Sequence, residues 1–84
     1  MAKLSLKEIR KNPDLIEIES VGDLIRRERI RKGITQKELA KMIYITQSWL
    51  SKIEDGNGEP DLIEGLRILT ILNIPIKTIK KLFF

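Results

Sequence analysis

The sequence contains no cysteine and no histidine. Disulfide bonds, zinc sites built on thiolates or imidazoles, haem ligation and catalysis through a thiol or an imidazole are therefore excluded. No G-x-S-x-G, P-loop or glycine-rich phosphate motif occurs, and no carboxylates are clustered as a pair. We therefore expect a protein that is not an enzyme and needs no cofactor or metal.

Long hydrophobic runs are also missing. No apolar stretch approaches the roughly 18 residues that a membrane-spanning helix needs. The first residues lack a long apolar segment followed by a cleavage site. We expect a cytoplasmic protein that has no contact with a membrane.

The 84 residues that are present suffice for one domain. Hydrophobic residues, mostly Ile and Leu, make up 42% of the chain, which is enough for a packed core. The net charge of +4 is concentrated, because residues 21–55 hold eight basic and five acidic side chains while residues 1–20 are balanced. Such a basic segment either is simply solvated or attracts the phosphates of a nucleic acid.

The N-terminal residues predict one short helix. Ser5 and Glu8 form the pattern of a capping box, Leu6 and Ile9 are its apolar pair, and Asn12-Pro13 ends the helix. Residues 14–19 alternate apolar and acidic side chains, which is compatible with a strand or with a connector. We favour the connector, because a single strand would have to pair with a second copy of the chain.

Three capped helices are expected in the middle of the chain. Ser20 begins the first, which ends at Gly33; Thr35 begins the second with a capping box, and Thr46 begins the third, which ends at residues 55–58. The inward side chains should be Val21, Ile25 and the stem of Arg29 in the first, Leu39, Ala40 and Ile43 in the second, and Leu50 and Ile53 in the third.

Two further helices are expected towards the C-terminus. Pro60-Asp61 opens one that should end at Asn73 in a left-handed conformation, and Gly65 inside it suggests close packing against a neighbour. Pro75 opens the other. The inward residues should be Leu62, Leu66, Leu69 and Leu72 in the former and Ile76, Ile79, Leu82 and Phe83 in the latter.

Two short helices joined by a tight turn, at residues 35–43 and 46–55, form the pattern of a helix-turn-helix. Its residues Gly33-Ile34-Thr35-Gln36-Lys37-Glu38-Leu39-Ala40, Ile45-Thr46-Gln47-Ser48-Trp49-Leu50-Ser51-Lys52-Ile53-Glu54 and Pro60 resemble the Cro/cI-type helix-turn-helix family, also called the xenobiotic-response-element (XRE) family. The resemblance implies an all-α, five-helix, lambda-repressor-like DNA-binding domain over residues 21–74. An N-terminal arm of residues 1–20, with a short helix or an extended form, would precede it, and a C-terminal helix of residues 75–84 would follow it.

The sequence departs from the family pattern at three positions. Tyr44 stands where the turn usually has glycine, and a tyrosine with positive φ costs on the order of 1 kcal/mol. Glu59 replaces a residue that is often basic, and Gly65 replaces a common leucine.

The outer face of the helix that begins at Thr46 carries the candidate base contacts. On a helical wheel, Leu50 and Ile53 lie opposite a polar side that consists of Gln47, Ser48, Ser51 and Lys52. Taken alone, such a side chain set is more typical of a solvated surface. The family resemblance instead favours base recognition in the major groove of DNA.

The resemblance also assigns supporting roles. Gln36 resembles a family glutamine that binds a backbone phosphate. Apart from the resemblance, Lys37, Thr46 and Asn57 are the other candidate phosphate contacts, and Lys37 could equally be a solvated side chain. Trp49 and Tyr44 could pack against the protein or touch DNA, with packing preferred for Trp49. Arg29 and Glu54 resemble a structural ion pair of the family.

The sequence thus predicts a transcriptional regulator, a repressor, that binds a double-stranded DNA operator as a homodimer and has no small-molecule effector. Dimerisation is expected through the apolar flanks, although the two terminal helices could instead pack on each other in a monomer. The alternative function is an antitoxin-like module that binds a partner protein and contacts DNA secondarily.

Overall fold

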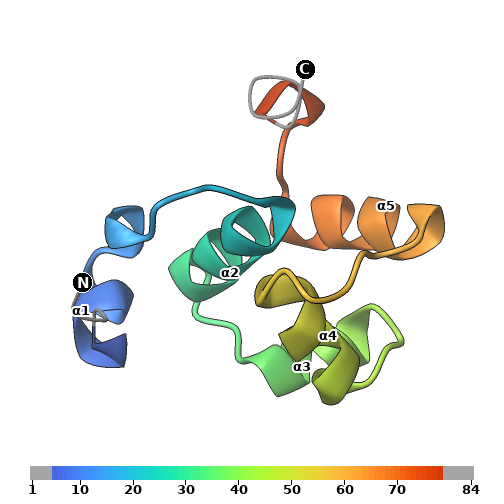
Figure 1. The fold of residues 1–84 in the computed structure, drawn as a ribbon, viewed down its shortest axis with the longest axis horizontal. Coiled ribbons are helices and arrows are strands. Elements are labelled where there is room, and N and C mark those ends of the chain that lie inside the picture. Colours follow the sequence, from blue (N-terminus) through green and yellow to red (C-terminus); the bar gives the residue numbers. More distant parts are fainter. Residues whose placement is uncertain (1–4, 79–84) are drawn as a thin grey trace.

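The computed structural model describes residues 5–78. Within this range the chain is all-α, as expected, and contains no strand (Figure 1). The elements are α1 (Leu6–Lys11), the 3-10 helix η1 (Pro13–Leu15), α2 (Val21–Arg31), α3 (Gln36–Met42), α4 (Gln47–Glu54) and α5 (Leu62–Leu72). Residues 76–78 form a further helical turn. Residues 14–19, for which a strand was the alternative, form η1 and a connector.

Side-chain caps define where the helices begin. The side chains of Ser5, Ser20, Thr35, Thr46 and Asp61 each accept a hydrogen bond from the backbone N–H of the third residue of the following helix. Thr35 and Asp61 form complete capping boxes with the acidic residues three positions later. Each cap satisfies a backbone donor that has no partner within the helix.

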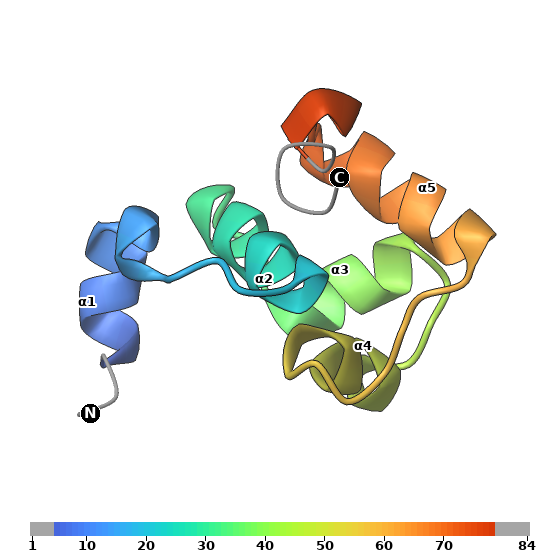
Figure 2. The same ribbon diagram turned by 45° about the horizontal axis from the view of Figure 1, so that its top comes forward.

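The core lies where α2, α3, α4 and α5 meet (Figure 2). Its largest fully buried side chains are aliphatic: Leu24, Leu39, Ile43, Leu50, Ile53, Ile68 and Leu72. The predicted inward positions of α3 and α4 are thus confirmed. In α2, Ile25 is buried as predicted, but Val21 is only half-buried and Leu24, which was not predicted, takes the central place.

The predicted inward face of α5 is partly wrong. Leu62 and Leu66 are 78% and 51% exposed, whereas Ile68 is buried together with Leu72, and Leu69 is half-buried. The helix is apolar on more than one side, so its sequence periodicity is compatible with several inward faces. Packing against α2 selects the side that carries Ile68 and Leu72.

The glycine that allows close packing is Gly22, not Gly65 as predicted. A Cβ on Gly22 would lie 2.2 Å from the carbonyl oxygen of Ile53 and 2.7 Å from that of Glu54. The start of α2 therefore approaches the backbone at the end of α4. A Cβ on Gly65 would meet no atom within 4 Å.

The N-terminal segment is docked at the C-terminal end of α2. Ile9 and Ile16 are buried, and Arg31 forms ion pairs with Asp14 and with Glu28. The hydrogen bond to Asp14 is the main cause that raises the pKa of the Arg31 guanidinium above its ordinary value. In Figures 1 and 2, α1 lies at one end of the molecule and α5 at the other.

The C-terminal connection agrees with the prediction in its backbone. Asn73 ends α5 with a left-handed φ of 54°, and a helical turn follows Pro75. The inward position predicted for Ile76 is wrong, because Ile76 is 65% exposed and packs on no core surface within the described residues. The remaining predicted apolar residues of the last helix, Ile79, Leu82 and Phe83, lie outside the described residues.

Candidate nucleic-acid interface

The turn between α3 and α4 holds the two helices in a helix-turn-helix arrangement. The backbone N–H of Ile45 donates to the carbonyl of Ala40 (3.0 Å), and Tyr44 has a φ of 63°. Tyrosine thus adopts the left-handed conformation for which glycine is the usual residue, at the expected cost of about 1 kcal/mol. Tyr44 is 82% exposed, and the guanidinium of Arg67 lies 5.1 Å from the centroid of its ring.

A buried carboxylate connects α4 to the rest of the domain. Nε and Nη2 of Arg29 donate to the two oxygens of Glu54 at 2.7 and 3.0 Å, so the expected ion pair is present. Nη1 of Arg29 also donates to the carbonyl of Ile34 at 3.0 Å. The side chain of Glu54 is 1% exposed, so these hydrogen bonds compensate for a charge that water cannot reach.

Gln36 is part of the same network. Its Nε2 donates to Oε1 of Glu54 at 3.1 Å, which orients the amide at the start of α3 towards α4. A glutamine amide has two N–H groups, so one remains for a ligand. The network therefore fixes the position of Gln36 relative to the first turns of α4.

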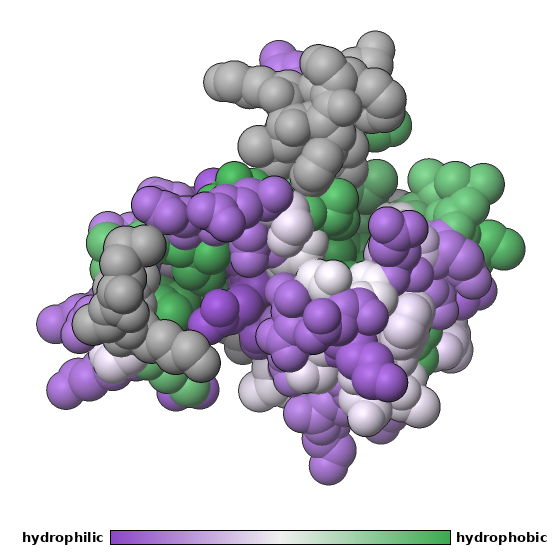
Figure 3. Space-filling view, viewed as in Figure 1, coloured by the Kyte–Doolittle hydropathy of each residue, from purple (hydrophilic) through white to green (hydrophobic). Residues whose placement is uncertain are grey.

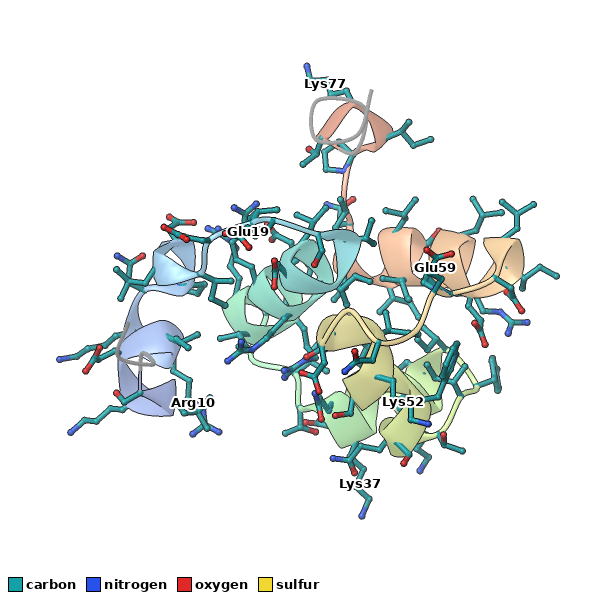
Figure 4. All side chains as sticks on the ribbon, viewed as in Figure 1. Arg10, Glu19, Lys37, Lys52, Glu59 and Lys77 are labelled. Carbon is teal, nitrogen blue, oxygen red and sulfur yellow. The ribbon has the colours of Figure 1, made fainter. Side chains whose placement is uncertain are left out.

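The four candidate base contacts lie together on one side of α4, which we call the α4 outer face. Gln47, Ser48 and Lys52 are exposed, and Ser51 is half-exposed. These four residues and Gln36 line a shallow groove on the surface. In Figure 4, Lys52 on α4 and Lys37 on α3 lie at the same side of the molecule.

The remaining candidate phosphate contacts do not line this groove. Lys37 and Asn57 are exposed, the first in α3 and the second in the loop after α4. Thr46 is exposed at the start of α4, where its Oγ1 accepts from the N–H of Trp49 (3.1 Å). Because the hydroxyl can still donate its own hydrogen, Thr46 retains a group for an anionic ligand.

Trp49 packs against the protein. Its Nε1 donates to Oε1 of Glu64 in α5 at 3.2 Å, and a Cβ on Gly58 would lie 2.6 Å from its ring. The indole is thus held between α5 and the loop that precedes it. The sequence did not predict Glu64 as its partner, because the two residues belong to different helices.

In Figure 3 the surface over α3 and α4 ranges from hydrophilic to neutral, whereas hydrophobic residues gather at the right-hand end of α5. Within residues 5–78, no group of His, Cys, Asp or Glu could hold a metal ion. No helix in the same range is long and apolar enough to cross a membrane.

Two residues next to the site were not identified from the sequence. Gly22 is a second glycine inside a predicted helix, where glycine is less favourable than alanine. This unfavourable residue could have indicated a close contact with a neighbouring helix. Arg10 borders a cleft shared with Gln36 and Gln47, and no local pattern indicates this position.

Two capped helices, a tight turn and an exposed polar face on the second helix define a helix-turn-helix DNA-binding domain. The Helix-turn-helix family model matches residues 25–79, and the chain belongs to this family, of the Cro/cI (XRE) type. Members of this family are DNA-binding transcriptional regulators and typically are not enzymes.

Similar proteins include a phage protein and a bacterial regulator. The chain is 29% identical over 66 residues to the "ImmF control region 10 kDa protein" of Bacillus phage phi105. The matched region is 79% of this chain and 73% of the phage protein. It is 33% identical over 61 residues to the "Transcriptional regulator ClgR" of two Mycobacterium tuberculosis strains, which covers 73% of this chain. The matched part is only 54% of the ClgR length. No solved structure matches the chain.

Proposed function

We propose that this protein is a sequence-specific regulator that inserts α4 into the major groove of double-stranded DNA and represses transcription. The observation that carries the proposal is the α4 outer face, which exposes polar side chains while Leu50 and Ile53 on the opposite side are buried. The major groove, about 12 Å wide, admits one helix. An α-helix of this length, about 12 Å, can present its outer face to several base pairs.

Each member of the α4 outer face has chemistry suited to base edges. Gln47 can bond N6 and N7 of adenine, Lys52 can reach O6 or N7 of guanine, and the serines can pair with several bases. The proposed phosphate contacts are Gln36, Lys37, Thr46 and Asn57. Gln36 is the strongest of these, because Glu54 already orients its amide beside the groove.

A homodimer is the proposed binding unit. Leu62, Ile63 and Leu66 of α5 expose 78%, 60% and 51% of their surface, which favours a protein contact on this side of the domain. A two-fold dimer would place two α4 helices on related half-sites, one or more turns of DNA apart. Binding across a promoter would then repress transcription by occlusion.

The comparisons support a regulatory role without identifying a target. The similar phage protein is named for a control region, and ClgR is named as a transcriptional regulator. These names describe the relatives, and for this chain they favour regulation of transcription over other uses of DNA binding.

Selection from a random DNA pool tests the proposal. We expect an enriched site with two symmetric halves, and an affinity that falls steeply as salt rises, since phosphate contacts release counterions. An unenriched pool would contradict sequence-specific binding, and a flat salt response would contradict the phosphate contacts. Sedimentation that gives 9.7 kDa at micromolar protein would contradict the dimer.

The exposed apolar side of α5 also supports the second candidate, an antitoxin-like module that binds a partner protein. Under this function, a second small protein would co-purify with the chain and protect Ile63 and Leu66 from solvent. A homodimer without any co-purifying protein would favour the regulator.

A further inference from the structure

A cleft of about 840 Å³ separates α1 from the helix-turn-helix. Its lining includes Leu6 and Arg10 of α1, Lys32 and Gly33 after α2, and Gln36 and Gln47 of the helix-turn-helix. The family match begins at residue 25, so α1 is additional to it. The cleft therefore joins a segment outside the matched domain to the groove beside the α4 outer face.

The position of α1 is held by contacts and not only by the chain connection. Ile9 is 4% exposed and Ile16 is 7% exposed, so the N-terminal segment contributes two aliphatic side chains to the interior. Arg31 links Asp14 of η1 to Glu28 of α2. A side chain on the inner side of α1 therefore has a defined place relative to α2 and α3.

Two cations in the cleft have no carboxylate partner among residues 5–78. Four cationic side chains line the cleft. Two of them are paired: Arg29 with Glu54, and Arg31 with Asp14 and Glu28. Arg10 and Lys32 are exposed and form no ion pair in the described part of the chain. In Figure 4, Arg10 lies on the lower side of the molecule, where Lys37 and Lys52 also lie.

We propose that Arg10 and Lys32 bind backbone phosphates of the DNA that flanks the bases read by α4. The inference rests on the proposed function, because α4 in the major groove sets where the flanking duplex runs. A DNA strand held by Gln36 continues along the cleft that Gln36 shares with both cations. The ligand is the phosphodiester backbone, so this contact adds affinity and site length but no base preference.

The test uses the full chain and two duplexes that contain the selected site. One duplex ends at the last base pair of the site, and the other extends by about six base pairs on each side. On the extended duplex, Arg10→Ala should weaken binding roughly threefold to tenfold and reduce the slope of log K against log salt by about 0.9 per lost contact. On the short duplex, Arg10→Ala should bind like the wild type.

The matched control is Lys11→Ala, which removes the same charge from an exposed position of α1 that does not line the cleft. It should leave binding to both duplexes unchanged. Lys32→Ala should reproduce the effect of Arg10→Ala, while Arg10→Lys should restore most of the lost affinity. Equal thermal unfolding of all variants would show that α1 remains docked.

Equal effects of Arg10→Ala and Lys11→Ala, or equal effects on the two duplexes, would overturn the inference while leaving α4 recognition intact. Failure of the proposed function has a different signature, because the wild type would then not discriminate the selected site from random DNA. Ethylation of the outer phosphates should interfere with wild-type binding more than with binding of Arg10→Ala, which keeps only the Lys32 contact.

Discussion

The helices α4 and α5 differ in the chemistry of the side that each exposes to solvent. Each begins with a side-chain cap and buries two large aliphatic residues, Leu50 and Ile53 in α4 and Ile68 and Leu72 in α5. The outer face of α4 is polar, whereas that of α5 exposes Leu62, Ile63 and Leu66. Both helices therefore bury aliphatic side chains on one side, and they differ in the polarity of the side chains on the other.

This difference separates two kinds of contact. A polar, uncharged-to-basic helix face suits the hydrated edges of bases and phosphates, while a group of exposed leucine and isoleucine side chains suits another protein surface. The proposed DNA contact and the proposed protein contact thus lie on two different helices. The following changes test each side of this comparison.

The largest effect is expected from removing the support beneath α4. Arg29→Ala would leave Glu54 buried without its main partner, so the free energy of unfolding should fall by about 3–5 kcal/mol. Urea unfolding followed by Trp49 fluorescence measures this. Lys41→Ala, which removes an exposed cation of α3, is the control and should change stability by less than about 0.5 kcal/mol. Equal losses in both variants would mean that the ion pair does not support α4.

The two sides of α5 should respond differently to truncation. Ile68→Ala should cost about 2–5 kcal/mol, because it leaves a cavity in the core. Leu66→Ala should cost less than about 0.5 kcal/mol at submicromolar protein and more at high concentration, where dimer formation contributes to stability. Unfolding at two protein concentrations separates the cases. A concentration-independent loss in Leu66→Ala would argue against a dimer through this side.

The α4 outer face should affect DNA discrimination. Gln47→Ala should lose about 1–3 kcal/mol on the selected site and little on random DNA, whereas Gln36→Ala should weaken both more evenly. Fluorescence anisotropy with one duplex that carries the selected site and one of random sequence measures the losses. If both variants lost affinity equally on the selected and the random duplex, Gln47 would not read a base.

The two helix-interior glycines should have opposite responses to alanine. Gly65→Ala should stabilise α5 by about 0.5–1 kcal/mol, since the methyl group meets open space and alanine favours the helix. Gly22→Ala should destabilise by about 1–3 kcal/mol, since its Cβ would clash with backbone carbonyls of α4. Thermal unfolding would show a raised Tm for the first and a lowered Tm for the second. A lowered Tm in Gly65→Ala would contradict the open space beside α5.

The smallest effect concerns the start of α3, on which α4 packs. Hydrogen bonds from the backbone N–H and the side chain of Thr35 lower the pKa of Glu38 below its ordinary value of 4.5. The folded state thus favours the ionised form of Glu38. The contribution of this carboxylate to the free energy of unfolding is therefore present above pH 4.5 and is lost as pH falls through the lowered pKa. Comparing Glu38→Gln with the wild type at pH 7 and pH 3 should show a smaller difference at pH 3. A difference that does not shrink would contradict this linkage.

The helix boundaries and one special backbone position were predictable because they depend on nearby residues. Ser20, Thr35 and Thr46 cap helices through hydrogen bonds to residues three positions away. Asn73 has the expected positive φ, whereas the positive φ of Tyr44 did not follow from its residue type, since tyrosine replaces the glycine usual at this turn. The family pattern further indicated the Arg29–Glu54 ion pair, which spans 25 positions and has no local signal.

The candidate site was predictable only as a set of residues on α4. Its surroundings were not, because they depend on how separate helices pack. The indole of Trp49 donates to Glu64, Gln36 donates to Glu54, and Arg10 borders the cleft beside Gln36. Each of these contacts involves two different helices, and no local sequence pattern specifies how those helices lie relative to each other.

By itself, the sequence determined an all-α chain, the starts of its helices and the polar side of α4, since these follow from caps, turns and periodicity within a few residues. Only the tertiary structure decided that α5 buries Ile68 and exposes Leu66, that Gly22 is the close contact, and that α1 lies beside the site. The physical reason is that an apolar helix has several faces it can bury, and only the shape of its neighbours selects one.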